Sequence, residues 1–276
     1  MTTPRLSVVI PAYNNGKTIA ETIRSILADE GDDIELVVAD HSSTDDTLKQ
    51  IRQFASDDRV TILETPSGGG APRNWNRVTE SARGELLKLV CGDDIVLPGT
   101  LRRQMEILED PSVSLTACRR DIVDAEGKVL FSGWGLRGIG KRMPGHRAVR
   151  AAVRAGSNLF GEPASVMMRR SALADAGGWR SDFPYLIDQA TYSRVLLQGD
   201  FAPDLATGAT FRMSATQWSV VLVRDQATQA KEFHRALHVE HPRAVSAVDV
   251  MIGNVRATLM ARARQVSYWI LKRRMR

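Results

Sequence analysis

The sequence has 276 residues and a formal net charge of +5 at neutral pH; 43% of its residues are hydrophobic and 25% are charged. These values describe a globular protein of one large or two closely packed domains, and they exclude an intrinsically disordered chain. The first hydrophobic run, 6–10, is too short for a signal peptide, and no run approaches about 18 apolar residues, so neither secretion nor a membrane-spanning helix is expected.

The positive charge is concentrated near the C-terminus. No acidic residue follows Asp249, and the basic residues beyond it contribute +7, which leaves −2 for the rest of the chain. This distribution argues against a general nucleic-acid-binding surface, and no nucleic-acid partner is expected. Cys91 and Cys118 are too few for a disulfide framework or a zinc site and suit a reducing cytoplasm, where we expect the protein to reside.

Strands and helices alternate over the first 120 residues. Apolar runs predict strands at 6–10, 34–39, 60–63 and 86–90. A capping box of Thr18 and Glu21 opens the first helix, and further helices are expected after 43–46, over 74–82 and from Pro98. This alternation predicts an α/β fold in which a mostly parallel sheet is flanked by helices.

The pattern is weaker from residue 121 to about 215. Residues 124–127 indicate a hairpin turn, 164–168 a strand, and Asp188 the start of a helix.

Apolar residues recur at spacings of three and four near the C-terminus and predict a long amphipathic helix with a basic outer face. They are Val245, Val248, Ile252, Val255, Leu259, Ala263, Val266 and Ile270. Two interpretations stay open. The apolar stripe packs on the rest of the chain or on a second subunit, or the segment 245–276 makes a peripheral contact with an anionic membrane.

Polar residues follow three of the predicted strands. They are 11–14, 40–43, and the pair Asp93 and Asp94. In open parallel sheets, ligands bind outside the carboxyl ends of the strands, so these groups predict one binding site. Adjacent carboxylates repel each other unless a cation offsets them, and a hard divalent ion is one solution. An acidic loop that caps the next helix is the alternative.

The stretches 6–14 (LSVVIPAYN) and 37–47 (VVADHSSTDDT) resemble the first two strands and turns of the family 2 glycosyltransferases, which have the nucleotide-sugar-binding GT-A fold. The stretches 74–77 (NWNR) and 82–85 (ARGE), with Asp93, Asp94 and Pro98, are similar to a common variant of that family. The resemblance is strong over about residues 5–110. It continues more loosely through 177–179, Asp188 and Arg212.

The resemblance implies an inverting, metal-dependent transfer of a sugar from a nucleoside diphosphate, expected as a UDP-sugar. The implied acceptor is the hydroxyl of a glycan or of a lipid-linked molecule, in bacterial surface glycan synthesis. The residues expected to contact the nucleotide-sugar are Pro11, Ala12, Tyr13, Asp40, Arg73, Asn76, Asp93 and Arg212. Asp94, with Asp93, is the expected ligand of Mg²⁺ or Mn²⁺, which would bridge the diphosphate oxygens.

Asp188 is the expected general base, because it follows 177–179 as the acidic residue of the family does. A carboxylate there would accept the proton of the acceptor hydroxyl. A helix N-cap is the alternative role of Asp188, and Asp182 is its rival as the base.

Four positions depart from the family pattern. Cys91 replaces a carboxylate, so weaker metal binding is expected; His41 replaces a glycine, Ile187 an acidic residue and Ser214 a histidine. These departures keep open a non-catalytic nucleotide-sugar-binding protein of the same fold. A sugar nucleotidyltransferase is a third hypothesis, disfavoured because no Gly-rich loop with Arg and Lys follows the first strand.

His234, His238 and His241 lie close together beside Glu232 and Glu240. Their spacing permits a metal site, but a polar helix face is the favoured interpretation.

From these patterns we expect three regions in the chain. Residues 1–120 form a nucleotide-sugar-binding half, 121–215 an acceptor-binding half of the same catalytic domain, and 216–276 a helical basic extension. A homodimer stays open.

Overall fold

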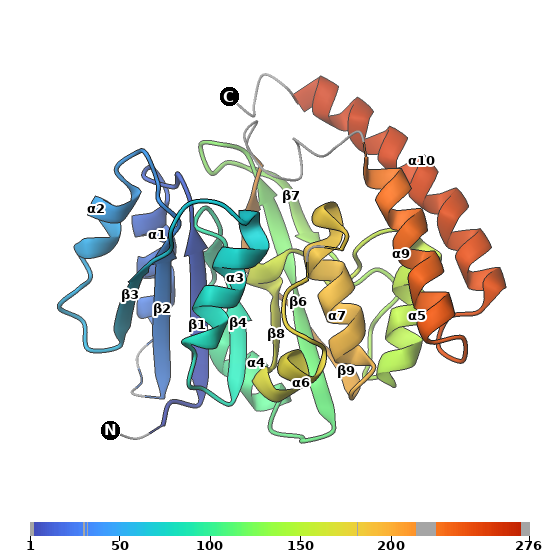
Figure 1. Ribbon diagram of the computed structural model, residues 1–276, viewed down its shortest axis with the longest axis horizontal. Helices are drawn as coiled ribbons and strands as arrows, with labels where there is room; N and C mark the ends of the chain where they lie inside the picture. Colours follow the sequence, from blue (N-terminus) through green and yellow to red (C-terminus); the bar gives the residue numbers. More distant parts are fainter. Residues whose placement is uncertain (1–2, 30, 32, 181, 214–224, 272–276) are drawn as a thin grey trace.

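The structure is a computed structural model that describes residues 3–29, 31, 33–180, 182–213 and 225–271, with only the backbone for 264–271. In this part of the chain, nine strands form one sheet in the order β3-β2-β1-β4-β8-β6-β9-β5, with β7 paired to β6 (Figure 1). The strands are β1 (Leu6–Ala12), β2 (Ile34–Asp40), β3 (Val60–Glu64), β4 (Leu86–Leu89), β5 (Ile95–Val96), β6 (Val113–Val123), β7 (Val129–Trp134), β8 (Val166–Arg169) and β9 (Asp200–Arg212).

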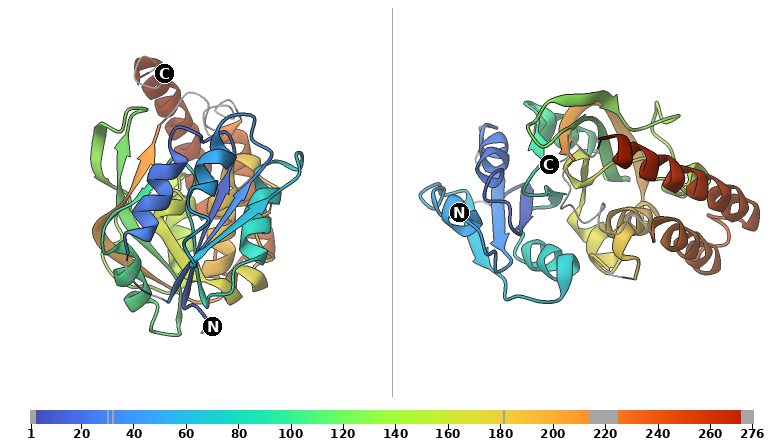
Figure 2. Two further views of the ribbon diagram at one scale, coloured as in Figure 1. Left: turned by 90° about the vertical axis from the view of Figure 1, so that its left-hand side faces the viewer. Right: turned by 90° about the horizontal axis from the view of Figure 1, so that it is seen from above.

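Helices cover both faces of the sheet, and each face has its own hydrophobic core (Figure 2). One face carries α1 (Ile19–Leu27), α2 (Thr47–Arg52) and α4 (Thr100–Ile107). The other carries α3 (Gly70–Glu80), α5 (Gly145–Ala155), α6 (Arg170–Asp175) and α7 (Ile187–Leu196), with α9 (Gln226–Glu240) and α10 (Ala247–Leu271) packed outside α5. Two 3₁₀ turns are η1 (Pro163–Ser165) and η2 (Pro184–Leu186). The predicted α/β fold is therefore confirmed.

The directions of the strands explain how segments that are far apart in the sequence lie at the same edge of the sheet. β1, β2, β3 and β4 are parallel, β8 is antiparallel to β4, and β6 and β9 again run in the direction of β4. The carboxyl ends of β1, β2, β4, β6 and β9 therefore lie at the same edge as the amino ends of β8 and β5. We call this edge the carboxyl edge; it is at the top in Figure 1.

The four strands expected in the first 90 residues are present, and a hairpin joins β6 to β7 around 124–127 as predicted. Two boundaries differ. The helix expected from residue 74 begins at Gly70, and the strand expected from 164 begins at Val166, because η1 occupies the preceding residues. The long strand β9 was not expected, because its alternating small and polar residues carry no apolar run.

The C-terminal helix exists; Val245, at the start of the predicted apolar stripe, is buried in the core, but three later residues of the stripe are not. Val248, Val255 and Leu259 are 57–59% exposed. The face that packs against α5 and α9 contains small residues, Gly253, Ala257 and Ala261, of which the two alanines are at most 7% exposed. The interpretation that the apolar stripe is buried on the rest of the chain is therefore wrong for these three residues. Val266 and Ile270 lie outside the described side chains.

Close approach of the two backbones explains this choice of face. A Cβ atom on Gly253 would lie 2.4 Å from the carbonyl oxygen of Val153 in α5, and one on Gly156 would lie 2.4 Å from the backbone nitrogen of Ala257. Gly156 also ends α5 with a positive φ of 64°. Side chains as large as valine or leucine cannot enter such a contact, so they lie on the opposite face of α10.

We expect Gly253→Val to cost about 1–3 kcal/mol of unfolding free energy, because the added side chain must push α10 away from α5. Thermal denaturation measures the effect as a fall of several degrees in Tm. Met251→Val, on the exposed face of the same helix, is the matched control and should leave Tm nearly unchanged. Equal Tm values for both variants would contradict the tight packing of α10 on α5.

None of the helices in the described part of the chain has the length and apolar character that crossing a bilayer requires.

Candidate active site

The turns after β1 and β2 form one side of the carboxyl edge. Asp40, the last residue of β2, is 3% exposed; its Oδ2 accepts a hydrogen bond of 3.1 Å from the backbone nitrogen of Ser43. Its buried Oδ1 has no partner among the described residues. Tyr13 is 57% exposed, and its ring lies edge-on to that of His41 at 6.1 Å. An exposed ring beside a buried carboxylate can hold a flat, polar ligand.

Asn74 holds this side of the site together. Its side-chain nitrogen donates to the carbonyl oxygens of Ala12 and Ala39, at 3.3 and 3.2 Å, and its oxygen accepts from the Thr65 hydroxyl at 2.8 Å. It therefore ties the ends of β1 and β2 to α3. Both amide protons and the amide oxygen of Asn74 are engaged in these hydrogen bonds, and we assign it a structural role.

Asn76 and Arg73, expected to contact the nucleotide, have other partners in this structure. The Asn76 amide donates to the carbonyl oxygen of Trp179 and accepts from its backbone nitrogen, at 2.8 and 3.0 Å. These two hydrogen bonds join α3 to the loop after α6 and give Asn76 a structural role; its contact with a nucleotide stays a prediction. Arg73 is exposed and donates to the carbonyl oxygen of Ser67 at 3.1 Å; its contact with a nucleotide stays a prediction.

Asp94 is the most buried carboxylate at the edge. It is 1% exposed, its Oδ1 accepts a hydrogen bond of 3.1 Å from the backbone nitrogen of Arg212, and its buried Oδ2 has no partner among the described residues. Burial raises the pKa of Asp94 well above its usual range, and the neighbouring Asp93 adds to this. A buried anionic group of this kind is costly unless a cation approaches it.

Arg212, at the end of β9, is the cation beside this pair. Its guanidinium donates to the carbonyl oxygens of Asp93 and Ala125 and to the carboxylate of Glu21, at 3.0–3.1 Å. Arg212 is 7% exposed. The β5–β9 pairing, Ile95 to Thr210, places it there.

The residues present fit a hard divalent cation. Oδ2 of Asp94, which has no hydrogen-bond partner among the described residues, is a suitable ligand for such a cation. Mg²⁺ is commonly held by one or two carboxylates together with substrate phosphates. In the described part of the chain, no group of three or more His, Cys, Asp or Glu side chains could hold a metal alone. A cation here would therefore depend on the oxygens of a bound ligand.

Asp188 lies in the first turn of α7, with Leu186 as the residue before the helix, so it is not the N-cap. Its Oδ2 accepts a hydrogen bond of 2.9 Å from the Asn158 amide, and its Oδ1 accepts one of 2.7 Å from the backbone nitrogen of Gln189. Burial raises the pKa of Asp188 to about 6, against the lowering effect of these bonds, and the charge of Glu162 raises it further. The carboxylate is held in place yet titrates near neutral pH, which suits a general base.

Glu162 is a site residue that the sequence did not predict. It precedes η1 and pairs with Arg120, which is 4% exposed and also donates to the carbonyl oxygen of Trp134 at 3.3 Å. Its charge reaches both Asp94 and Asp188. The signal in the sequence was the Gly161–Glu162–Pro163 turn before a strand, but only the reversed direction of β8 brings that turn to the carboxyl edge.

Cys91 is close enough to the Asp93–Asp94 pair and to the candidate base Asp188 for their charges to affect its thiol. Burial raises the pKa of its thiol, and the charges of Asp94, Asp93, Asp188 and Glu162 raise it further, in that order. Carboxylates that follow β4, precede η1 and lie in α7 therefore all act electrostatically on this one thiol. A fifth carboxylate at position 91 would add further repulsion, which is a physical reason why a neutral cysteine suits this position.

Asp182, the rival base, has other partners. It is exposed and forms ion pairs with Arg180 at 2.7 Å and Arg194 at 3.7 Å. Ile187, the first residue of α7, is buried in the core, and Ser214 lies outside the described residues. We therefore retain Asp188 as the candidate base.

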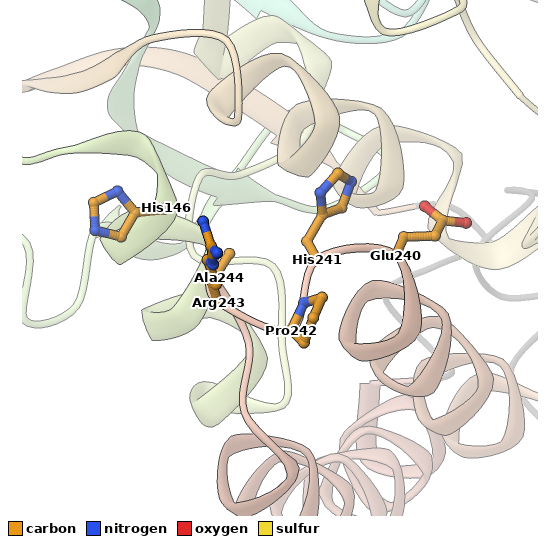
Figure 3. Close-up of a pocket in the computed structure, with 6 residues that line it drawn as sticks. All are labelled: His146, Glu240, His241, Pro242, Arg243 and Ala244. Carbon is orange, nitrogen blue, oxygen red and sulfur yellow. The ribbon is translucent and has the colours of Figure 1, made fainter.

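The histidines near the C-terminus join helices. Nδ1 of His234 lies 3.0 Å from Oδ1 of Asn254 in α10, and Nδ1 of His238 lies 2.8 Å from the carbonyl oxygen of Val245. Figure 3 shows a pocket of about 470 Å³ lined by His146 of α5 and by Glu240, His241 and Arg243 of the turn between α9 and α10. This turn lies at the end of the molecule away from the carboxyl edge (Figure 1). The pocket is therefore separate from the candidate site.

Curated bacterial proteins are similar in sequence to part of this chain. An uncharacterized protein of Mycobacterium tuberculosis is 37% identical over 205 residues, which cover 71% of this chain and 63% of that protein. A Campylobacter jejuni protein named GalNAc(5)-diNAcBac-PP-undecaprenol beta-1,3-glucosyltransferase is 28% identical over 137 residues, 48% of this chain and 44% of that protein. The matches span less than two thirds of the length of either relative.

Two solved structures share the fold at low identity. TarS of S. aureus, in complex with UDP-GlcNAc, has a TM-score of 0.69 and 17% identity over 86% of this chain and 66% of that chain. The mannosyltransferase PcManGT of Pyrobaculum calidifontis, in complex with GDP-Man and Mn²⁺, has a TM-score of 0.63 and 19% identity over 98% of this chain and 81% of that chain. The likeness confirms the predicted GT-A-type fold.

The family resemblance noted in the sequence is tested by the family's own sequence model. The model described as glycosyl transferase family 2 matches residues 7–177, more than half of the chain. The matched region contains β1 to α6 and therefore Asp40, Asp93, Asp94 and Glu162. The chain belongs to the family 2 glycosyltransferases.

Proposed function

We propose that this protein is an inverting glycosyltransferase that moves a sugar from a nucleoside diphosphate to an acceptor hydroxyl. The observation that carries the proposal is that Asp94, Asp188 and Glu162, although they lie on separate elements, all act electrostatically on Cys91. Such a transfer needs two groups. One is a carboxylate oxygen without a protein partner that can bind a cation, here Oδ2 of Asp94, and the other is a carboxylate whose pKa lies near neutral pH, here Asp188.

One set of residues would bind the nucleotide-sugar donor, and another would act on the acceptor hydroxyl. Tyr13 and Asp40 would hold the nucleoside at the ends of β1 and β2, together with Pro11 and Ala12, the last two residues of β1. Asp94 and Asp93 would hold Mg²⁺ or Mn²⁺, and that cation, when bound, supplies positive charge to the departing diphosphate.

Asp188 would accept the proton of the acceptor hydroxyl while the hydroxyl oxygen bonds to the sugar carbon and the bond from that carbon to the diphosphate breaks. Because this is a single displacement, the configuration at the sugar carbon inverts. Asn158 and the backbone of Gln189 keep the carboxylate in place during the transfer. Arg212 fixes the chain around Asp93 and Asp94.

The pH dependence of the reaction reports on the base. The pKa of Asp188 is raised to about 6, and only the ionised carboxylate accepts a proton, so kcat/KM should fall about tenfold per pH unit below pH 6. Glu162→Gln removes a charge that raises this pKa, so the acidic limb of the profile should move to lower pH. A profile that is flat down to pH 4.5 would contradict the assignment of Asp188 as the base.

A thermal-shift screen tests the donor. We expect a UDP-sugar to raise Tm in the presence of Mn²⁺, because a ligand stabilises the state that binds it. The two structural neighbours were solved with different nucleotide-sugars, UDP-GlcNAc and GDP-Man, so UDP and GDP and their sugars belong in one screen. No shift with any nucleoside diphosphate would overturn the proposed donor class.

The second candidate is a non-catalytic nucleotide-sugar-binding protein, supported by the departures at Cys91 and Ile187. The fixed orientation of Asp188 and its pKa near neutral pH favour catalysis, since neither is needed for binding alone. Donor binding without turnover would favour this second candidate. For the acceptor, we propose a glycan or a lipid-linked glycan of a bacterial surface polymer, in keeping with the undecaprenol-linked acceptor in the name of the Campylobacter relative.

A further inference from the structure

The outer face of α10 is an exposed apolar stripe on an otherwise well-packed protein. Val248, Met251, Val255 and Leu259 are 57–63% exposed. Their spacings of three, four and four place them on one side of the helix, opposite Gly253 and its small neighbours that pack on α5. Single exposed apolar residues are ordinary, whereas four in a row along one helix mark a contact surface.

Basic side chains accompany this stripe. Arg256 and Arg262 are exposed on the same helix, and the sequence after Asp249 contains no acidic residue. Asp249 itself is 4% exposed and forms ion pairs with Arg150 at 3.5 Å and Arg154 at 3.3 Å, both from α5. The helix therefore offers apolar and positive groups to its surroundings and keeps its one carboxylate inside.

We propose that the outer face of α10, defined by Val248, Met251, Val255, Leu259 and Arg262, binds the surface of an anionic lipid bilayer. A helix with apolar residues on one side and arginines beside them lies in the plane of the interface, with the apolar groups among the acyl chains and the guanidinium groups at the headgroups. Anionic headgroups supply the negative charge that this helix lacks.

A second copy of the chain is a poorer occupant for this face. In a two-fold symmetric pair, the same face of α10 would meet itself, so each copy would bring the exposed Arg262 to the interface and no carboxylate of α10 to pair with it, since Asp249 is buried and paired with α5. Like charges at such an interface oppose association. The charge of the helix therefore favours lipid over self-association.

The position of α10 relates this face to the candidate site. The C-terminal end of α10 rises to the level of the carboxyl edge, where the site residues gather (Figure 1). A bilayer against this helix would bring that edge near the membrane surface, where a lipid-linked acceptor resides. This last step rests on the proposed function, whereas binding of the helix to lipid does not.

Flotation of the full chain with vesicles tests the proposal without any activity assay. We expect binding to vesicles of phosphatidylcholine with phosphatidylglycerol and about tenfold weaker binding to vesicles of phosphatidylcholine alone. The double variant Val255→Glu with Leu259→Glu should lose binding to the anionic vesicles. Val239→Glu, on α9 and 74% exposed in the wild type, is the matched control and should bind like the wild type.

The proposal is overturned if the wild type fails to bind anionic vesicles or if the double variant binds as well as the control. It is also overturned if sedimentation shows a dimer that the double variant abolishes, because the face would then belong to a second copy. Arg262→Glu should weaken vesicle binding about tenfold and leave Tm unchanged, since this side chain is exposed. Unchanged vesicle binding by Arg262→Glu would contradict the electrostatic part of the proposal.

Discussion

Asp188→Asn should lower kcat about 10²–10⁴-fold while leaving the binding of the donor nucleotide unchanged. The amide keeps the size of the side chain and can still accept a hydrogen bond from the backbone nitrogen of Gln189, but it cannot take a proton from the acceptor hydroxyl. Single-turnover assays measure the transfer, and calorimetric titration with the nucleoside diphosphate measures binding. A loss of transfer with unchanged nucleotide binding indicates a catalytic role, whereas a loss of both indicates a structural one.

Asp182→Asn is the matched control for this experiment. Asp182 lies six residues before Asp188, is exposed, and is paired with Arg180 and Arg194. Its replacement should change kcat less than about threefold, because exposed ion pairs contribute little. If Asp182→Asn abolished transfer and Asp188→Asn did not, the two roles would have to be exchanged.

Asp94→Asn should abolish the Mn²⁺-dependent part of nucleotide binding and lower transfer by about 10²-fold or more, because the cation would lose its buried carboxylate. Without ligands, the variant should be at least as stable as the wild type. The substitution removes a buried charge whose Oδ2 has no partner among the described residues, and an amide in its place can still accept from the backbone of Arg212.

Asp200→Asn controls for the general loss of a carboxylate. Asp200 begins β9 at the opposite edge of the sheet, where it pairs with Arg142 at 2.9 Å. Nucleotide binding by this variant should keep its full response to Mn²⁺. A wild-type response in Asp94→Asn would show that the cation does not depend on Asp94.

Much of the first half of the site could be predicted from the sequence because it is local. Asp40 and the pair Asp93 and Asp94 follow apolar runs directly, and parallel strands bring their carboxyl ends together. Strand direction could not be predicted for the second half. Glu162 reaches the same edge only because β8 is antiparallel to β4, and an antiparallel strand in an α/β pattern leaves no periodic signal.

Two features of the structure could not be predicted, because the sequence does not show which partner a side chain meets. Asn76 lies in a motif of the family, yet its amide is bound by the backbone of Trp179, more than 100 residues away in the chain. For the C-terminal helix, the sequence left open whether the apolar stripe packs on the chain, on a second subunit or on a membrane. The approach of α5 at Gly156 and Gly253 admits only small residues, so Val248, Val255 and Leu259 are exposed. Periodicity locates an amphipathic helix and does not decide which of its faces is covered.

A crystal structure of the protein with a nucleoside diphosphate and Mn²⁺ tests the central claim, and the anomalous scattering of manganese identifies the ion directly. We predict an anomalous peak within about 2.0–2.3 Å of a carboxylate oxygen of Asp94 and of oxygens of the diphosphate, with the nucleoside beside Tyr13 and Asp40. A manganese peak bound elsewhere, or a nucleotide bound away from the carboxyl edge, would contradict it.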